Sequence, residues 1–425
     1  MNSSYETAVN RANLETMADS PAHSAEASTE YALTVDGARI ALKHRARPKG
    51  SPVVLIHGLA VNADLWDLPD VRGDDFEYRS LATVLYEAGH DIWLMNVRGI
   101  GGPERLSEPP PGQRDWCIDH FILYDLPATI DHVITRTGRR PFVVGSSMGA
   151  MSLSGYLQGA RLAGAGDAQR IFPDAGLSRR RQERLAGCVF VQFPAALRWP
   201  HSIYDDSGQI KWNALISKWR WDEADANYPF ELLSRLGWLQ ALVEATGSVN
   251  LHWVRSNRNS DKGRATLPKP FADVWRKTER GLTTAMTKLY NKYKGTTHSR
   301  PEMFLSGGIR DAVDHLKAGV LRQLGKSVRA GGFVSALGEP DHVYSDHYDL
   351  VTAPTLLVLG GKDRIANADV TREAFFEKIT SNDKMLQFYE EIAHGEFEAA
   401  PIAFEKVYPE IRSWFGARDK EACPA

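Results

Sequence analysis

One serine in the sequence lies in a pattern that could make it a nucleophile. Ser147 is the middle residue of Gly145-Ser146-Ser147-Met148-Gly149, which follows a short apolar run and opens a stretch that favours helix. A sharp turn from strand to helix exposes the hydroxyl of such a serine, and flanking glycines let neighbouring segments approach closely. The N-terminus of the following helix favours a developing negative charge. The motif therefore predicts that Ser147 is a catalytic nucleophile.

A serine hydroxyl needs a base to become nucleophilic, and that base needs a carboxylate to orient it. Asp363 follows the apolar run TLLVLGG, and His394 stands 31 residues further along the chain. The order serine, acid, histidine is the one that a doubly wound hydrolase sheet uses for its catalytic triad. We therefore predict that Asp363 and His394 act together with Ser147.

Acyl transfer also needs hydrogen-bond donors for the oxyanion of its tetrahedral intermediate. Met148 follows the nucleophile and supplies one amide, whereas the second amide must come from a loop after an earlier strand. The segment His57-Gly58-Leu59 closes the apolar run that begins at Val53. We predict that the backbone amides of Leu59 and Met148 are the two donors. Gly58 then permits close backbone approach, and His57 is predicted to be a structural histidine rather than a second base.

These residues are predicted to lie at the ends of strands in a chain that alternates strand and helix. Continuous apolar runs, typical of strands buried on both faces, occur at 53–57, 90–95, 142–145, 188–193 and 355–359. Helices are predicted at 79–89, 125–136, 148–158, 369–379 and 398–415. Two strands joined by a turn at 36–37 are predicted at the start, and a short strand at 385–389. The alternation predicts an α/β fold with a mostly parallel, doubly wound sheet.

The alternation stops over a block that reads as one large helical insertion. Residues 194–353 contain no buried-strand run, and they hold seven of the eleven tryptophans. We predict a hydrolase core formed by 30–193 and 354–418, with a helical cap at 194–353 and a flexible N-terminal tail at 1–29. Some tryptophans of the cap are predicted to face a hydrophobic substrate, and the cap could contact a lipid interface.

Composition excludes several other classes of protein. With 51 Lys and Arg against 53 Asp and Glu, the formal net charge of −2 gives no reason to expect a nucleic-acid partner. No apolar run approaches the roughly 18–20 residues of a membrane span, and the first thirty residues lack the apolar region of a signal peptide. The three cysteines lie outside any metal-binding spacing. We predict a cytoplasmic protein with no metal and no cofactor; no feature indicates its oligomeric state.

Several segments resemble the acid lipases of the gastric and lysosomal type. They are HGL at 57–59 with Trp66, DIWLMNVRG at 91–99 and YDLPATID at 124–131. The resemblance covers about residues 50–155 and, more weakly, 350–415, and similar segments occur in the polyester (polyhydroxyalkanoate) synthases. It implies the α/β-hydrolase fold, with the family's nucleophile, acid and base at Ser147, Asp363 and His394 and its first oxyanion donor at Leu59.

The sequence departs from both families next to the nucleophile. Ser146 and Met148 stand where acid lipases usually have His and Gln, and the polyester synthases use Cys where this chain has Ser147. The triglyceride substrate of the secreted lipases therefore does not carry over. The residues predict a serine hydrolase that cleaves a carboxylic ester of a hydrophobic substrate through an acyl-enzyme. An acyltransferase, a hydrolase of carbon–carbon or amide bonds, and a non-catalytic binding protein are the alternatives.

Overall fold

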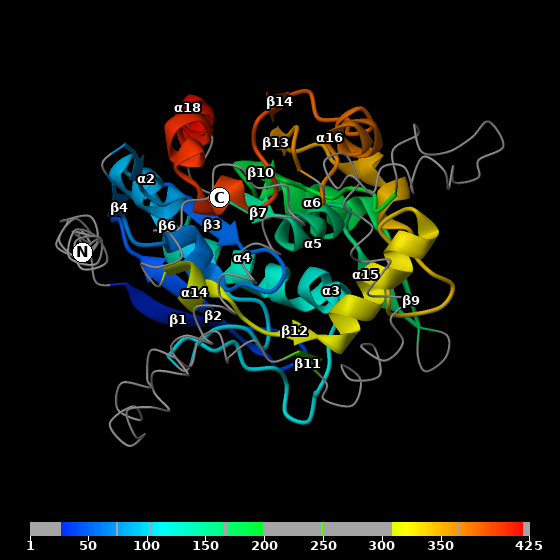
Figure 1. Ribbon diagram of the computed structural model, residues 1–425. Helices are drawn as coiled ribbons and strands as arrows, with labels where there is room; N and C mark the ends of the chain where they lie inside the picture. The colour runs from blue at the N-terminus through cyan, green and yellow to red at the C-terminus, as the bar shows by residue number, and fades with distance from the viewer. Residues whose placement is uncertain are drawn as a thin grey trace, which may run out of the picture.

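The computed structural model describes residues 27–73, 75–102, 104–164, 169–198, 248–249, 308–363 and 365–419. Most of the predicted N-terminal tail lies outside the described residues, and so does the predicted cap from Trp199 to residue 307, apart from Ser248–Val249. The seven tryptophans of the predicted cap are all in that part of the chain. The sheet and its surrounding helices are described almost completely (Figure 1).

An eight-stranded sheet forms the centre of the protein, with the order β1-β2-β6-β3-β7-β10-β13-β14. Its strands are β1 (Ser28–Leu33), β2 (Arg39–Arg45), β3 (Pro52–Ile56), β6 (Asp91–Met95), β7 (Phe142–Ser146), β10 (Gly187–Val191), β13 (Thr355–Gly360) and β14 (Lys384–Tyr389). β1 and β2 pair antiparallel, β2 pairs antiparallel with β6, and all the remaining pairs are parallel. The mostly parallel, doubly wound sheet predicted from the sequence is thus confirmed.

The apolar runs form strands because the sheet is covered on both faces. Successive side chains of a strand point to opposite faces, so a strand that is buried on both sides needs no polar position. In β3, Val53 and Leu55 belong to one hydrophobic core, whereas Val54 and Ile56 belong to the other. All five residues of β3 are buried, as are those of β6, β7 and β10.

Helices cover each face of the sheet (Figure 1). One face packs against α3 (Ile118–His120), η2 (Phe121–Asp125), α4 (Leu126–Thr137), α5 (Met148–Leu157), α15 (Ala318–Ala330), α16 (Ala368–Thr371) and η7 (Arg372–Phe376), and α6 (Ala175–Glu183) lies against α5. The other packs against η1 (Ala63–Asp67), α2 (Leu81–Glu87), α14 (Gly308–Ala312), α17 (Glu396–Ala399), η8 (Ala403–Val407) and α18 (Tyr408–Arg418). Figure 1 shows α2 and α18 together on this second side.

The helix predicted at 125–136 is α4, which begins at Leu126 with Pro127 in its first turn. The sequence did not predict the helical turns before it. The chain is already helical from Ile118 and passes through a π-helical turn, η2, in which the Leu126 amide donates to the Phe121 carbonyl five residues back. This wider turn lies directly before Pro127, which has no N–H to donate. Gly138 ends the helix with a left-handed φ of 65°.

Two other predicted elements have different boundaries, and three pairs of short strands were not predicted. β1 begins at Ser28, because that residue pairs with His44 of β2, so the predicted tail ends two residues earlier. The helix predicted at 398–415 is divided into α17, η8 and α18, and Pro401 lies at the first break. Three pairs of very short strands were missed, since two or three residues are too few to show a period. They are β4 (Val71–Arg72) with β5 (Glu77–Tyr78), β8 (Arg161–Ala163) with β9 (Arg170–Phe172), and β11 (Ser248–Val249) with β12 (Leu316–Lys317).

The described end of the predicted cap packs on the core of the sheet. From α15 to β13 the chain contributes Val320, Leu324, Phe333, Tyr344 and Tyr348 to the same hydrophobic core as α4 and α5. Short 3-10 turns, η5 (Tyr344–Asp346) and η6 (Tyr348–Leu350), carry the two tyrosines. Residues 318–353 are thus part of the packing that supports the sheet, and the boundaries predicted for the cap stay a prediction.

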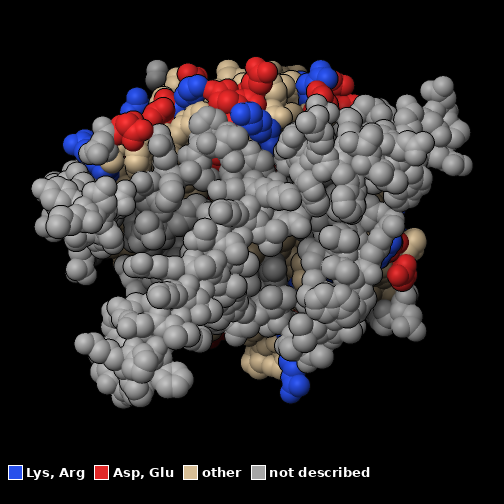
Figure 2. Space-filling model, viewed as in Figure 1, with Lys and Arg blue, Asp and Glu red and all other residues tan. Residues whose placement is uncertain are grey.

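Charges of both signs are mixed on the described surface. Figure 2 shows Lys and Arg side chains interleaved with Asp and Glu along the upper edge, the side of α18 and α16 in Figure 1. None of the described helices is both long enough and apolar enough to cross a bilayer. Along this upper edge, the described residues therefore show charges of both signs rather than one.

Candidate active site

The turn between β7 and α5 presents Ser147 in a strained conformation. Its backbone has φ 51° and ψ −114°, which residues other than glycine rarely adopt. The turn is tight because its glycines approach neighbouring backbone. A Cβ on Gly145 would lie 2.8 Å from the Ala150 nitrogen, and one on Gly149 would lie 2.7 Å from the His57 carbonyl oxygen. The two glycines predicted to support the motif are thus required by the geometry of this turn.

The structure brings Ser147, His394 and Asp363 together from three separate loops. His394 Nε2 lies 3.1 Å from Ser147 Oγ, and His394 Nδ1 lies 3.0 and 2.9 Å from the two carboxylate oxygens of Asp363. The three residues follow β7, β14 and β13, at the carboxyl edge of the parallel strands where ligands bind in such sheets. They are buried, with only 8%, 4% and 5% of their surface exposed in that order.

Asp363 is held in the orientation that the histidine needs. Its Oδ1 accepts hydrogen bonds from the backbone amides of Ile365 and Ala366, both at 2.8 Å. The carboxylate therefore meets the ring at Nδ1, and a proton on Nδ1 leaves Nε2 free to accept from the Ser147 hydroxyl. These are the contacts that the predicted roles of nucleophile, base and orienting acid require.

Two backbone amides lie beside the nucleophile without an acceptor. Among the described residues, neither the Leu59 amide nor the Met148 amide donates a hydrogen bond. Met148 is the first residue of α5, where helix amides have no intrahelical partner. The loop that carries Leu59 runs close to Ser147, since a Cβ on Gly58 would lie 3.9 Å from Ser147 Oγ. Both amides are thus available to an oxyanion that forms at Ser147.

His57 is fixed by the backbone around it. Its Nδ1 donates to the Gly58 carbonyl at 2.8 Å, and its Nε2 accepts from the Val97 amide at 3.3 Å. Burial lowers the pKa of His57, against smaller opposing effects of the Gly58 carbonyl and Asp314, so the ring is neutral. His57 therefore shapes the loop that carries Leu59, and it is not in contact with the triad.

Comparison with known proteins gives the same fold. A family model described as the alpha/beta hydrolase fold matches residues 51–159, which include the Leu59 loop and Ser147. The chain has the α/β-hydrolase fold. A second family model, described as serine aminopeptidase, S33, matches residues 310–398, which include Asp363 and His394. The two matched segments therefore carry the two halves of the predicted site.

Curated relatives of this α/β hydrolase include several lipases. It is 36% identical to human gastric triacylglycerol lipase over 126 residues, 28% of this chain and 30% of that protein. Triacylglycerol lipase 2 of Arabidopsis thaliana is 32% identical over 106 residues, 24% of each protein, and human lipase member K is 38% identical over 111 residues, 25% of this chain and 26% of that protein. The distant similarity to gastric-type lipases is thus confirmed, over 24% to 30% of the relatives' length.

The resemblance to polyester synthases is not tested by these relatives and stays a prediction.

Among solved structures, the monoacylglycerol lipase of Paleococcus ferrophilus aligns with a TM-score of 0.47 at 15% identity, over 89% of this chain and 99% of that one. A likeness this weak carries no argument about activity.

Two of the lipase-like segments of this α/β hydrolase meet in a buried ion pair. Arg98 follows β6, and its guanidinium donates to Asp125 Oδ1 at 2.6 and 2.9 Å and to Asp36 Oδ2 at 2.7 Å. The Arg98 amide also donates to Asp125 Oδ2. Buried ion pairs persist when hydrogen bonds satisfy the charged atoms, as they do here. The DIWLMNVRG and YDLPATID segments therefore share a structural role, outside the triad.

The sequence did not predict a cluster of hydrogen-bonded polar side chains that begins at Ser146, the residue before the nucleophile. Gln192, which follows β10, donates to Ser146 Oγ at 2.8 Å and to Glu398 Oε1 at 2.7 Å, and Ser146 also donates to Glu398. The Gln192 side-chain carbonyl accepts from the Gly395 amide at 2.6 Å. Ser146 and Gly395 are direct neighbours of Ser147 and His394 in the sequence, and Gln192 and Glu398 contact them. The only signal in the sequence was that Ser146 departs from the residue usual in acid lipases.

Backbone strain gathers at the same edge of the sheet. Four non-glycine residues in the described chain have positive φ, and three of them, Ala60, Ser147 and Gln192, follow the adjacent strands β3, β7 and β10. Strained residues persist only where the surrounding structure holds them, and they cluster at functional sites. This distribution supports the assignment of the site to this edge.

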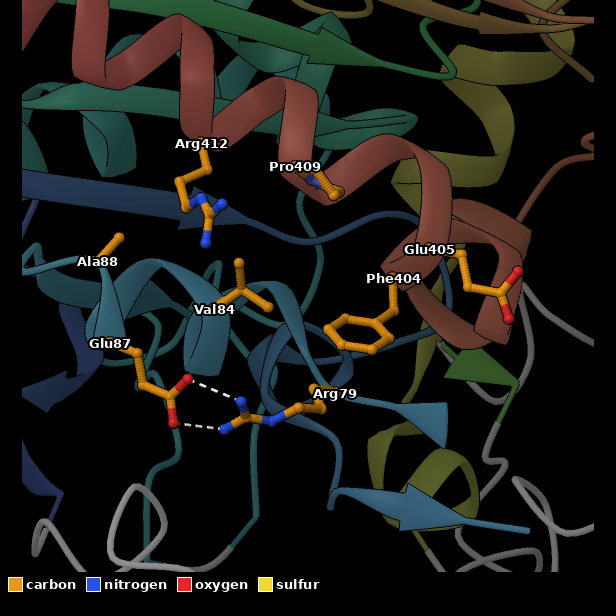
Figure 3. Close-up of a pocket in the computed structure, with 8 residues that line it drawn as sticks. All are labelled: Arg79, Val84, Glu87, Ala88, Phe404, Glu405, Pro409 and Arg412. Carbon is orange, nitrogen blue, oxygen red and sulfur yellow. Dashed lines mark hydrogen bonds and ion pairs between the residues drawn. The ribbon is translucent and has the colours of Figure 1, made fainter. Parts of the chain in front are cut away.

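A possible metal site and a surface groove were also considered as functional sites. Among the described residues, no three His, Cys, Asp or Glu side chains are placed to hold a metal ion. A groove of about 450 Å³ lies between α2 and the C-terminal helices, lined by Arg79, Val84, Glu87, Ala88, Phe404, Glu405, Pro409 and Arg412 (Figure 3). An ion pair between Arg79 and Glu87 occupies one side of this groove. None of its lining residues belongs to the triad or to the oxyanion loop.

Proposed function

We propose that this protein is a serine hydrolase that cleaves carboxylic esters of hydrophobic substrates. The observation that carries the proposal is the pair of contacts made by His394, to Ser147 Oγ through Nε2 and to Asp363 through Nδ1. This arrangement supplies a nucleophile, its base and an oriented imidazole in one buried place. Similarity to gastric triacylglycerol lipase over 126 residues supports an ester as the substrate.

The proposed reaction has two steps. Ser147 Oγ attacks the ester carbonyl carbon while His394 Nε2 takes the hydroxyl proton, and Asp363 stabilises the imidazolium. The amides of Leu59 and Met148 donate to the carbonyl oxygen as it becomes an oxyanion. The carbon–oxygen bond to the alcohol then breaks, and His394 gives its proton to the leaving alkoxide. His394 Nε2 then takes a proton from water as the water attacks the acyl carbon. The bond from that carbon to Ser147 Oγ breaks, His394 returns the proton to Oγ, and the acid and free Ser147 are released.

The hydrophobic character of the substrate rests on the relatives and on the predicted cap. The similar proteins are named triacylglycerol lipases, and the predicted cap is rich in tryptophan. We propose an acyl ester or lipid-like ester, with contact to a lipid interface made through the cap. An amide substrate is the second candidate, because the segment with Asp363 and His394 matches a serine aminopeptidase model.

The test is turnover of p-nitrophenyl esters with short to long acyl chains, beside amino-acid p-nitroanilides. Ser147→Ala is expected to lower ester turnover by at least about 10³-fold, because the triad acts as a unit. It is also expected to abolish labelling by a fluorophosphonate probe. Ser154→Ala is the control, since Ser154 is buried in the same helix with its hydroxyl bound to the Met151 carbonyl.

The outcomes separate the alternatives. Turnover of anilides but not of esters would move the substrate class to amides. Labelling of Ser147 without turnover of any substrate would favour an acyltransferase that lacks its acceptor. Neither labelling nor turnover in folded protein would contradict the catalytic proposal and favour a binding protein.

A further inference from the structure

Gln192 connects the nucleophile's strand to the loop of the base. Its side-chain nitrogen donates to Ser146, the residue before the nucleophile, at 2.8 Å. Its side-chain oxygen accepts from the amide of Gly395, the residue after the base, at 2.6 Å. The remaining hydrogen bond goes to Glu398 in α17 at 2.7 Å, and Gln192 is only 3% exposed. One buried amide thus touches both segments that carry the reacting groups.

The backbone of Gln192 is strained in a way that favours a specific role for its side chain. Its φ of 43° lies in the left-handed region, which residues with a side chain rarely adopt. Glycine would occupy this conformation without strain. The backbone amide of Gln192 donates to the Val358 carbonyl of β13 at 2.9 Å, so the backbone of this strained residue is hydrogen-bonded to the sheet.

Gly395 is the point at which a small shift would move the base. It has a left-handed φ of 84° and begins the turn into α17, so its amide direction determines how the preceding residue lies. His394 must keep its Nε2 at 3.1 Å from Ser147 Oγ to accept a proton. The loop is also held by a hydrogen bond from the Ala393 amide to the Glu396 carboxylate at 2.8 Å, but among the described residues the Gly395 amide donates only to Gln192.

We propose that Gln192 is a positioning residue for the base and the nucleophile of the reaction proposed above. Its amide holds Gly395, and therefore the His394 ring, against the elbow that carries Ser147. Ser146 completes the arrangement because a small hydroxyl can accept from Gln192 while it donates to Glu398.

The experiment replaces Gln192 by the nearly isosteric Met, which cannot make these hydrogen bonds. Gln192→Met is expected to lower kcat by about 10- to 100-fold with KM little changed, because misplacement of a catalytic group by about 1 Å costs such factors. The rate of fluorophosphonate labelling should fall by the same factor. Gln192→Gly relieves the backbone strain, so it tests the same loss in a variant that folds more readily.

The matched control is Gln323→Met. Gln323 is also buried; its side-chain oxygen accepts from the Ile118 amide and its side-chain nitrogen donates to the Asp119 carboxylate, and neither partner belongs to the triad. Both substitutions should lower the melting temperature, but only the change at Gln192 should lower kcat and the labelling rate. These rates are measured well below the melting temperature of every variant.

The inference is overturned if Gln192→Met or Gln192→Gly keeps the wild-type kcat and labelling rate. It is also overturned if Gln323→Met lowers both as much, since a general loss of packing would then explain the effect. Failure of the wild type to be labelled or to turn over any ester or anilide is a different result. That result contradicts the proposed function itself, and this inference with it.

Discussion

Asp363 is the residue whose role is most specific in chemical terms. It contacts His394 Nδ1 with both carboxylate oxygens while two backbone amides hold one of them. Its function in the proposed mechanism is to select the imidazole tautomer and to stabilise the charge that forms. An amide in its place would keep the shape of the side chain but not this selection.

Asp363→Asn is therefore expected to lower kcat for the best ester substrate by about 10⁴-fold. The fold should be retained, because Asn can still accept from the amides of Ile365 and Ala366. Steady-state kinetics with a long-chain p-nitrophenyl ester would measure the loss. Asp349→Asn, at an exposed position of η6, is the control and should leave kcat unchanged. A loss below about tenfold at position 363 would mean that another group orients His394.

At the scale of the elements, the turn between β7 and α5 depends on the absence of side chains. A Cβ at position 149 would lie 2.7 Å from the carbonyl oxygens of Ile56 and His57, which is too close for a side chain. These neighbours are backbone atoms of β3 and its following loop, and they cannot move without disturbing the sheet. Gly416 in α18 is the opposite case, since a Cβ there would meet no atom within 4 Å.

Gly149→Ala is expected to lower the free energy of unfolding by about 1–3 kcal/mol, because it overpacks a tight site. Gly416→Ala is expected to raise it by about 0.5–1 kcal/mol, since alanine is a better helix former than glycine. Equilibrium denaturation in urea measures both changes. If Gly149→Ala left the free energy of unfolding unchanged or raised it, the close packing of the elbow against β3 would be contradicted.

The elements also show which kinds of local pattern are readable in a sequence. The strands with continuous apolar runs were predicted, because burial on both faces leaves a signal in every residue. The π-helical turn at Phe121–Asp125 was not, because it accompanies Pro127 and the burial of Asp119 and Asp125 against distant partners. The short strand pairs were missed because they contain too few residues to show alternation.

At the scale of the whole molecule, several buried histidines make stability depend on pH. Burial lowers the pKa of His57 and His90, and it lowers the pKa of His120 and of His342 to about 4, aided by Arg98 near His120 and His347 near His342. In the unfolded chain these histidines titrate near pH 6.5. Between about pH 6.5 and pH 4 the unfolded chain therefore binds more protons than the folded one.

The free energy of unfolding is expected to fall as the pH is lowered through this window. Each extra proton bound by the unfolded chain adds a slope of up to about 1.4 kcal/mol per pH unit. Melting temperatures measured from pH 7.5 to pH 4.5 should decrease below about pH 6.5, where the unfolded chain begins to bind the extra protons. His342→Phe keeps the aromatic packing against Tyr344 and removes one titrating ring, so it should reduce the slope. A melting temperature that is constant down to pH 5 would contradict this assignment.

Much of the fold and of the candidate site was predictable from the sequence alone. Local periodicity and turn chemistry can be read directly from a sequence. They predicted the apolar strands and the turn from strand to helix that carries Ser147, and the order of Ser147, Asp363 and His394 along the chain indicated their roles. Only the tertiary structure shows that His394 contacts the other two residues and that, within the described part of the chain, the amides of Leu59 and Met148 have no acceptor.

The role of Gln192 belongs entirely to the tertiary structure. Its partners Ser146 and Gly395 lie 46 and 203 residues away along the chain, and nothing in its neighbours marks it as different from any other glutamine. The physical reason is that a positive φ and a buried side-chain amide are stabilised by groups from other strands and helices. Local sequence determines which elements form, whereas the packing of those elements determines which polar groups meet at the carboxyl edge of the sheet.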